Sequence, residues 1–192
     1  MKVLLFLASG VEMIEASAFI DVFGWHRYYC AGDIHITTCG VTREIHSTFG
    51  VPIRVDTLIR DIDADDYDAL AVPGGFSEYG FYDDGYEKEV LDLIVSFDQS
   101  VKPIASICVG ALLLGKCGIL KGRKATTYHL MGKRRQAQLE EYGARVIDKP
   151  VVVDRNVITS WCPSTAINVA FALLEMLTSA EDKNKVKIMM GY

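Results

Sequence analysis

The sequence predicts an α/β protein, a doubly wound sandwich in which a mostly parallel sheet carries helices on both faces. Three observations support this fold class. Short apolar runs that read as strands alternate with segments whose apolar residues repeat at helical spacing. Several runs are apolar without interruption, as expected of parallel strands covered on both sides. The chain has 192 residues and contains no linker, repeat or low-complexity segment, which predicts one domain over residues 1–192.

The first part of the chain predicts two strands and one long helix. Residues 3–7 form an uninterrupted apolar run, typical of a buried strand, which ends before Gly10. Residues 12–29 predict a helix, because apolar residues recur there every three or four positions and acidic residues in the first turn suit the helix dipole. Residues 33–39 predict the second strand. Residues 41–62 contain short β-like pieces with turn signals, which indicate a hairpin or an edge excursion.

The middle of the chain predicts a surface turn, two strands and a helix. The acidic run at residues 61–66 is typical of a solvated turn, since it lacks the spacing and the glycine of a calcium-binding EF-hand. Residues 67–72 predict a buried strand that leads into a Pro-Gly-Gly turn. Residues 87–97 predict an amphipathic helix, and residues 104–107 predict another buried strand.

The last part predicts several short strands and two further helices after the one that begins at Ala111. Short strands are expected at residues 124–127, 144–147, 151–154 and 157–160. Residues 129–142 predict a helix that ends at Gly143. Residues 162–177 predict a very apolar helix with Ser164 or Thr165 as its N-cap, and such a helix must be covered on most sides.

Composition excludes several classes of protein. Hydrophobic residues make up 50% of the chain, charged residues 23%, and the net charge is −5, which argues against a nucleic-acid partner. No apolar run is long enough to predict a membrane span, and the N-terminal run is followed so soon by Glu12 and Glu15 that it predicts a core strand. The five cysteines are odd in number and form no CxxC pair, so we expect no zinc site, no disulfide scaffold and a cytoplasmic location.

Cys108 lies where the strand at residues 104–107 meets the helix that begins at Ala111. A sharp strand-to-helix turn behind a small nucleophilic side chain, with Gly110 two residues on, is the pattern of a nucleophile elbow. The N–H groups and partial positive charge of a helix N-terminus favour a thiolate there. The alternative is an inert, buried cysteine in a packed junction.

Glu15 is the carboxylate with the most informative surroundings. Its helix neighbours Phe19, Val22 and Phe23 turn it inward, and a buried carboxyl group prefers to be protonated. A protonated Glu15 can donate a hydrogen bond to a thiolate and later move a proton. The alternative is a surface glutamate that the helix dipole favours, a role that suits Glu12 better.

Gly74 and Gly75 follow the strand at residues 67–72. Their N–H groups, with that of Val109, can bind a developing oxyanion, although a plain turn explains the pair almost as well. Five aromatic residues come next, and they either wall a pocket or pack over the sheet edge: Phe76, Tyr79, Phe81, Tyr82 and Tyr86. No phosphate-binding loop accompanies them, so no cofactor is expected.

Two candidate proton carriers follow the strand at residues 124–127. Tyr128 and His129 are neighbours, and either can reach a site at the end of that strand. The basic run at residues 133–135 is expected to form a solvated face. Cys162, just before the last helix, can lie near the site or at an interface.

Together these features resemble the ThiJ/PfpI family, also called the DJ-one superfamily. The matching pieces extend through nearly the whole chain and are GVEMIE at 10–15, AVPGG at 71–75, ASICVG at 105–110, GRKATT at 122–127 and ITSWCPST at 158–165. The resemblance implies a flavodoxin-like, class I glutamine-amidotransferase-like fold and a homodimer. It also implies that Cys108 is the elbow cysteine, that Glu15 is its acid partner, and that Gly75 and Val109 supply backbone N–H groups.

Three positions depart from the pattern of the family. Peptidase-like members carry a histidine directly after the nucleophile, where this chain has Val109, and this counts against a protease. Members related to the human protein often carry a histidine after the Thr-Thr pair, but here Tyr128 holds that place and His129 comes one residue later. Where those members have an arginine near the site, this chain has Trp161, which predicts a more apolar pocket.

These observations favour a cysteine-dependent enzyme that acts on small reactive carbonyl compounds, as the glyoxalase-like and deglycase-like members of the family do. Cys108 would attack the carbonyl carbon, and Glu15 would move the proton with Tyr128 or His129 assisting. One alternative is a redox-responsive stress protein or chaperone with an oxidisable Cys108. A second is a hydrolase of amides, peptides or isonitriles, which would need a base near Cys108.

Overall fold

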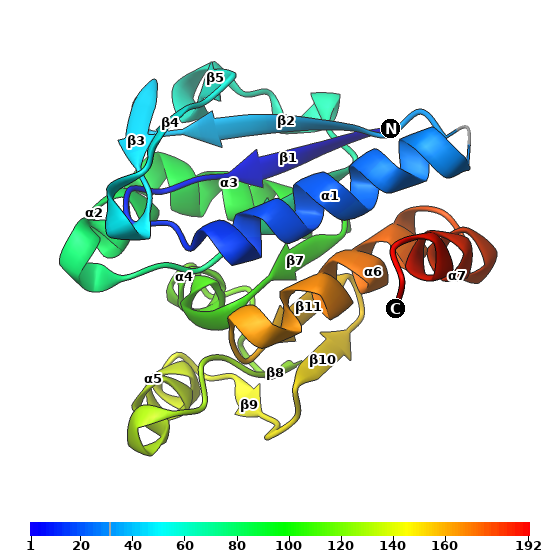
Figure 1. Ribbon diagram of the computed structural model, residues 1–192. Coiled ribbons are helices and arrows are strands. Elements are labelled where there is room, and N and C mark those ends of the chain that lie inside the picture. Colours follow the sequence, from blue (N-terminus) through cyan, green and yellow to red (C-terminus); the bar gives the residue numbers. More distant parts are fainter. Residues whose placement is uncertain (31) are drawn as a thin grey trace.

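The computed structural model describes residues 1–30 and 32–192 (Figure 1). Its strands are β1 (Lys2–Phe6), β2 (His35–Gly40), β3 (Glu44–His46), β4 (Pro52–Arg54), β5 (Thr57–Leu58), β6 (Ala69–Val72), β7 (Ile104–Ser106), β8 (Lys124–Ala125), β9 (Arg145–Val146), β10 (Val151–Asp154) and β11 (Val157–Ser160). Its helices are α1 (Met13–Tyr29), α2 (Phe81–Gly85), α3 (Lys88–Gln99), α4 (Ala111–Lys116), α5 (Arg134–Glu141), α6 (Ala166–Leu177) and α7 (Ala180–Met189). Every helix in the described ranges is too short or too polar to cross a bilayer.

The main sheet confirms the predicted fold class. Its strand order is β10-β11-β7-β6-β1-β2-β5, and all neighbours are parallel except the antiparallel pair β10–β11. Helices cover both faces, with α1, α6 and α7 on one and α3 and α4 on the other (Figure 1). Alternate residues of the same strand enter different cores. Leu5 of β1 belongs to the α1–α6 side, and Leu4 belongs to the α3–α4 side, as the two-residue period of a strand requires.

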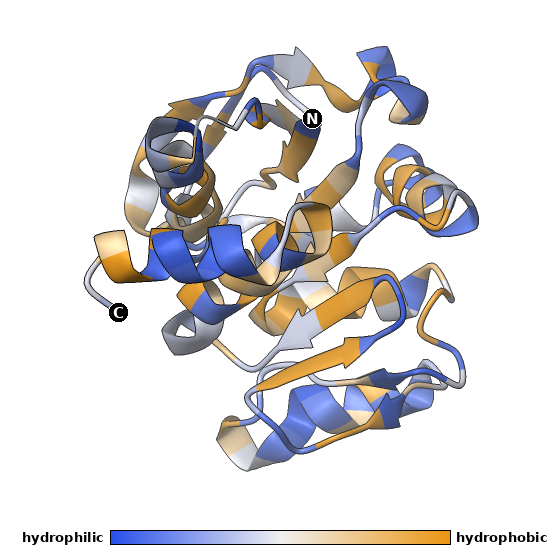
Figure 2. Cartoon of the chain, turned by 90° about the vertical axis from the view of Figure 1, so that its right-hand side faces the viewer, coloured by the Kyte–Doolittle hydropathy of each residue, from blue (hydrophilic) through white to orange (hydrophobic). Residues whose placement is uncertain are grey.

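The hydropathy of the elements follows this layering. Figure 2 shows apolar residues in several strands of the main sheet, whereas α5 and α7 consist largely of hydrophilic residues. In α6, half of the residues are buried, and the helix packs against α1, α7 and β11. The very apolar helix that the sequence predicts at residues 162–177 is therefore covered on several sides, as expected.

Two regions lie outside the main sheet. Residues 41–62 contain the predicted hairpin, in which β3 pairs with β4, and they also contribute the edge strand β5. The short strands β8 and β9 pair with each other in a separate two-stranded sheet. The prediction of a helix over residues 129–142 was wrong at its start, because Met131, Gly132 and Lys133 all have positive φ and the regular helix begins only at Arg134.

Candidate functional site

The site lies at the carboxyl ends of the central strands, where the turn after β7 bends sharply. Ile107 is extended, and Cys108 adopts φ of +54°, a left-handed conformation that side-chain-bearing residues seldom adopt. A 3₁₀ turn over Cys108–Gly110 then leads into α4. The Thr127 hydroxyl donates a hydrogen bond of 2.7 Å to the Cys108 carbonyl oxygen and holds this backbone in place. Strain of this kind clusters at functional sites and amounts to about 1–3 kcal/mol per residue.

Gly110 allows α4 to approach the sheet closely. A Cβ atom at this position would lie 2.5 Å from the Val72 carbonyl oxygen and 2.8 Å from Ser106 Oγ. Such contacts are too short for any side chain, so glycine is required for the turn to bring Cys108 to the end of β7. The glycine of the elbow pattern thus has a packing function.

Glu15 is fully buried although it carries a carboxyl group. Its Oε2 atom accepts a hydrogen bond of 2.6 Å from the Gly74 N–H. Its Oε1 atom has no hydrogen-bond partner, although the Cys108 thiol is close enough to affect the pKa of the carboxyl group. Burial raises the pKa of Glu15 from 4.5 to about 8, against the lowering effect of the Gly74 N–H. Glu15 is therefore protonated at neutral pH, as the sequence predicts.

The Cys108 thiol behaves differently from the sequence-based expectation. Burial raises the pKa of the thiol well above its ordinary value, and the negative charge of an ionised Glu15 raises it further. The Val109 N–H hydrogen-bonds to the sulfur and opposes the shift without cancelling it. The prediction that the turn favours a thiolate was wrong for the resting site, because burial of the sulfur raises the pKa of the thiol more than the Val109 N–H lowers it.

Gly74 and Gly75 have different functions, and one departs from the prediction. The Gly74 N–H is engaged by Glu15 and is not free for an oxyanion. Gly75 forms a β-bridge with Val11, and the hydrogen bonds of that bridge come from the flanking residues, so the Gly75 N–H takes no part in them. A Cβ atom at Gly75 would lie 2.3 Å from the Gly10 carbonyl oxygen, which makes glycine necessary there.

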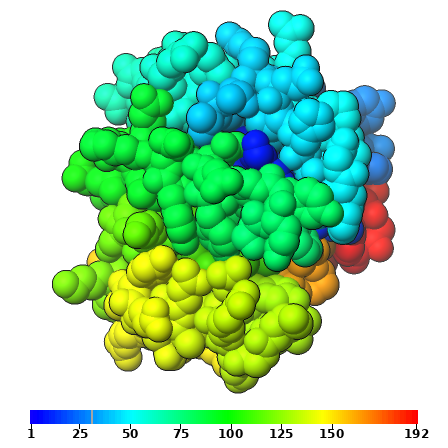
Figure 3. Space-filling view, turned by 90° about the vertical axis from the view of Figure 1, so that its left-hand side faces the viewer, coloured from blue at the N-terminus to red at the C-terminus, as the bar shows by residue number. Residues whose placement is uncertain are grey.

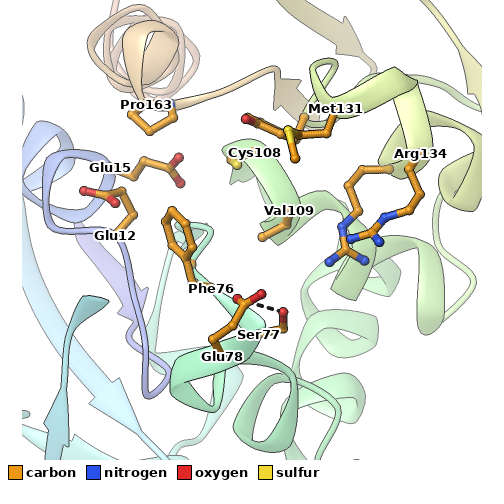
Figure 4. Close-up of a pocket in the computed structure, with 13 residues that line it drawn as sticks. Glu12, Glu15, Phe76, Ser77, Glu78, Cys108, Val109, Met131, Arg134 and Pro163 are labelled. Atoms are coloured by element: carbon orange, nitrogen blue, oxygen red, sulfur yellow. Dashed lines mark hydrogen bonds between the residues drawn. The ribbon is translucent and has the colours of Figure 1, made fainter. Parts of the chain in front are cut away.

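A cavity of about 510 Å³ opens above these groups, large enough for a small organic molecule. Figure 4 shows the carboxyl group of Glu15 beside Cys108, with Val109 on the other side of the sulfur. The lining residues come from both halves of the chain: Glu12, Glu15, Gly75, Phe76, Ser77, Glu78, Cys108, Val109, Tyr128, Met131, Arg134, Arg135 and Pro163. On the outer face in Figure 3, the β3–β4 hairpin in cyan, the segment after β6 in green and the α5 region in yellow-green lie next to one another.

Of the two predicted proton carriers, the structure brings one to the cavity. Tyr128 is among its lining residues. His129 instead stacks on Trp161, with ring centroids 4.1 Å apart, and neither residue lines the cavity. The prediction that His129 assists at the site therefore has no support in the geometry, and Trp161 does not line the pocket that it was expected to make more apolar.

Comparison with known proteins agrees with this architecture. The model of the DJ-1/PfpI family matches residues 1–176. The chain belongs to the DJ-1/PfpI family. The protein dj-1beta of Drosophila melanogaster is 31% identical to it, over 95% of this chain and 92% of that protein. A protein of Thermococcus kodakarensis named deglycase is 32% identical, over 85% of this chain and 91% of its own length.

A solved structure within the DJ-1/PfpI family confirms the fold. The crystal structure of Drosophila melanogaster DJ-1beta superposes with a TM-score of 0.84 at 28% identity, covering 98% of this chain and 96% of that one. The flavodoxin-like sandwich implied by the sequence resemblance is therefore the fold of this chain.

Several lining residues of this DJ-1/PfpI site escaped the sequence analysis. Arg134 and Arg135 were expected on a solvated face, but the late start of α5 brings both to the cavity. Glu12 was interpreted as a surface glutamate, yet it lines the cavity while its side chain caps α1 at the Ile14 N–H. Two adjacent arginines after a turn carry no spacing signal that predicts a shared cavity.

One potential metal-binding cluster lies elsewhere in the described ranges. Ligand atoms of His26, Cys30 and Asp182 all lie within 4.8 Å of one another, where α1 meets α7. His26 Nε2 and Asp182 Oδ2 are 3.3 Å apart and already form a polar contact. None of the three residues lines the cavity, so this cluster plays no part in the candidate site.

Proposed function

We propose that this protein is a cysteine-dependent enzyme that acts on small reactive carbonyl compounds. The observation that carries the proposal is the placement of the Cys108 sulfur at the cavity, between a protonated Glu15 and the Val109 N–H. The name deglycase, given to a relative of similar length, supports the same class of substrate. The more specific glyoxalase-like activity is part of this proposal.

The chemistry begins with addition of the thiol to an aldehyde or ketone carbon. The Cys108 sulfur forms a bond to that carbon while the π electron pair of the carbonyl moves to oxygen. The Gly75 and Val109 N–H groups stabilise the oxygen as negative charge develops. Glu15 donates its proton to that oxygen and accepts the thiol proton in turn, so the product is a neutral hemithioacetal and the acid is regenerated.

A 2-oxoaldehyde can react further without a cofactor. Transfer of the C1 proton to C2 of the hemithioacetal gives a 2-hydroxy thioester, and water then releases the 2-hydroxy acid and the free thiol. Glu15 and Tyr128 line the cavity and are the groups that can move this proton. The overall reaction adds one water to the substrate and needs no oxidant.

Turnover of methylglyoxal by the pure protein tests the proposal. We expect Cys108→Ala to abolish turnover, because it removes the nucleophile. Cys117→Ala is the matched control, since Cys117 lies at the end of α4 and does not line the cavity. Unchanged activity in Cys108→Ala, or no turnover by the wild type over a panel of 2-oxoaldehydes, would contradict the proposal.

A redox-responsive protein is the second candidate, and the Oε1 atom of Glu15 favours it. That buried atom has no partner and, when protonated, can donate a hydrogen bond to an oxygen added to Cys108. The raised pKa of the thiol, which follows from burial, opposes the idea because oxidants react with the thiolate. Intact mass after mild peroxide treatment separates the candidates: a two-oxygen adduct confined to Cys108 supports redox sensing, and an unmodified thiol excludes it.

The assembly and location of the protein remain proposals. We propose a homodimer, supported by a group of exposed aromatic side chains in which the ring of Phe49 lies beside those of Phe76 and Tyr79. Light scattering during gel filtration tests this, and a monomeric mass would contradict it. We also propose a cytoplasmic location, which the five free cysteines support because thiols persist in a reducing compartment.

A further inference from the structure

The cavity has one basic side and one acidic side. Figure 4 shows Arg134 extending along the side of the cavity opposite Glu12 and Glu15, with Cys108 and Val109 between them. Arg135 lines the same cavity from the first turn of α5. Because Glu15 is protonated at neutral pH, the acidic side carries less negative charge than its two carboxyl groups suggest.

Arg135 is held in position by two contacts. Its guanidinium carbon lies 5.2 Å from the centre of the Tyr82 ring, within the range of a cation–π interaction. Its Nη1 atom donates a hydrogen bond of 2.8 Å to Gln138 Oε1. A guanidinium has five N–H donors, so this arrangement orients the group and leaves donors available to a ligand.

Arg134 differs from the basic residue that precedes it. Lys133 forms an ion pair of 2.6 Å with Asp148 and does not line the cavity. Among the ion pairs and side-chain hydrogen bonds of residues 1–30 and 32–192, none involves the Arg134 guanidinium, and the residue is exposed at the cavity. Arg134 is therefore free to bind a ligand, whereas Lys133 is engaged elsewhere.

Glu78 lies at the same mouth and is the anion that could compete for these arginines. Its carboxylate accepts a hydrogen bond of 3.0 Å from the Ser77 hydroxyl. The pKa of Glu78 is lowered first by a backbone N–H and by Ser77, and in addition by the charges of Arg135 and Arg134. The two arginines thus act on a carboxylate at the mouth without forming a direct ion pair with it.

We propose that Arg134 and Arg135 form an anion subsite, and that the preferred substrates are small carbonyl compounds bearing a carboxylate or phosphate group. The inference rests on the proposed function for its substrate class, because the carbonyl carbon lies at Cys108 while the anionic group lies at the arginines. Paired arginines suit this role, since a guanidinium binds planar carboxylate or phosphate oxygens through two parallel hydrogen bonds. The two arginines of α5 thus give the cavity a cationic side, although Trp161 predicts a more apolar pocket.

Alkylation of Cys108 tests the anion subsite without requiring turnover. Iodoacetate and iodoacetamide both form a bond from sulfur to carbon and release iodide, but only iodoacetate carries a negative charge. The ratio of their rates at about pH 9, where more thiolate is present, reports the attraction of the cavity for anions. We expect Arg134→Gln with Arg135→Gln to lower this ratio by about tenfold and Arg134→Lys to retain most of it.

Lys133→Gln is the matched control, because it removes one positive charge from the adjacent residue outside the cavity. We expect it to leave the ratio unchanged. A ratio that is the same in the wild type and in the double arginine variant would overturn the proposal. The proposal would also be overturned if Lys133→Gln lowered the rate ratio as much as the double arginine variant does, because the effect would then come from the general surface potential.

Thermal unfolding gives a second readout and separates the two anion chemistries. Glyoxylate carries a carboxylate beside its aldehyde, and inorganic phosphate carries no carbonyl. We expect glyoxylate to raise the unfolding temperature of the wild type but not of the double arginine variant, and the response to phosphate identifies whether phosphate groups are also accepted. No stabilisation by either compound refutes the subsite. Stabilisation and arginine-dependent alkylation without turnover of any carbonyl compound would refute the proposed function and leave the subsite standing.

Discussion

Replacement of Glu15 by glutamine should make the stability of this protein less sensitive to pH. The native state raises the pKa of Glu15 from 4.5 to about 8 through burial, so between these values the unfolded chain loses the proton while the native state retains it. The native state is therefore progressively disfavoured as the pH rises. At about 1.4 kcal/mol per unit, the full shift corresponds to about 5 kcal/mol, lost between pH 4.5 and about pH 8.

The glutamine side chain in the Glu15→Gln variant is isosteric and keeps an oxygen that can accept the Gly74 N–H hydrogen bond, but it has no proton to lose. We expect the free energies of unfolding of the two proteins to diverge as the pH rises, with Glu15→Gln the more stable by several kcal/mol at about pH 8. Urea denaturation at a series of pH values between about 5 and 8 measures this difference. Glu12→Gln, at the N-cap of the same helix, measures a smaller contribution, because the charge of Glu12 also raises the pKa of Glu15.

A difference between wild type and Glu15→Gln that stays constant over this pH range would refute the reasoning. It would mean that the buried carboxyl group titrates in the native state as it does in the unfolded chain. A difference that falls as the pH rises would show that the native state prefers the carboxylate, which means that folding lowers the pKa of Glu15 instead of raising it.

Three further predictions follow from the turn around Cys108. The rate of its alkylation by iodoacetamide should keep rising with pH beyond the ordinary pKa of a thiol, because burial raises the pKa of Cys108; a plateau near neutral pH would contradict this. Gly110→Ala should lower the free energy of unfolding by about 1–3 kcal/mol, because its Cβ would lie 2.5 Å from the Val72 carbonyl oxygen; urea titration measures this. Gly118→Ala is the comparison, because its Cβ would meet no atom within 4 Å while its φ is positive, so the pair of variants separates crowding from backbone strain. Cys108→Gly should be more stable than Cys108→Ala by about 1 kcal/mol, because φ of +54° favours glycine, and equal urea midpoints would show that the turn is unstrained.

The parts of the fold that were predictable from sequence are those in which local pattern and tertiary burial agree. The apolar run of β6 is buried along its whole length, and its neighbours in the sheet, β1 and β7, are parallel to it. The start of α5 was missed although Gly132 is a turn residue, because nothing in the sequence marks the positive φ values of Met131 and Lys133 on either side of it. The pairing of β8 with β9 was not predictable either, because strands of two residues each are too short to show a periodic pattern.

The residues of the candidate site also fall into two groups, those that local sequence specifies and those that only the tertiary structure brings to the cavity. Cys108 and Glu15 were found because each is specified by its own neighbours, a turn glycine in one case and an inward helix face in the other. The positions of Tyr128, His129 and Arg134 depend on how the segment after β8 crosses the end of the sheet. In that segment the sequence offers several polar residues, and only the tertiary structure separates Tyr128 and Arg134, which line the cavity, from His129, which stacks on Trp161.

The resting protonation of Glu15 and Cys108 bears directly on the proposed selectivity. A thiol whose pKa is raised by burial reacts slowly with peroxide, which requires the thiolate, so the sulfur is protected while the cavity holds no substrate. A carbonyl compound changes this balance, because the developing charge moves to its own oxygen, which the Gly75 and Val109 N–H groups and the Glu15 proton can stabilise. Cys108 would then react only when a substrate is bound, and it would react fastest with carbonyl compounds whose oxygen reaches these donors. The raised pKa of Cys108 therefore opposes oxidation of the free thiol, whereas the proton of Glu15 can serve either a bound carbonyl oxygen or an oxygen added to the sulfur.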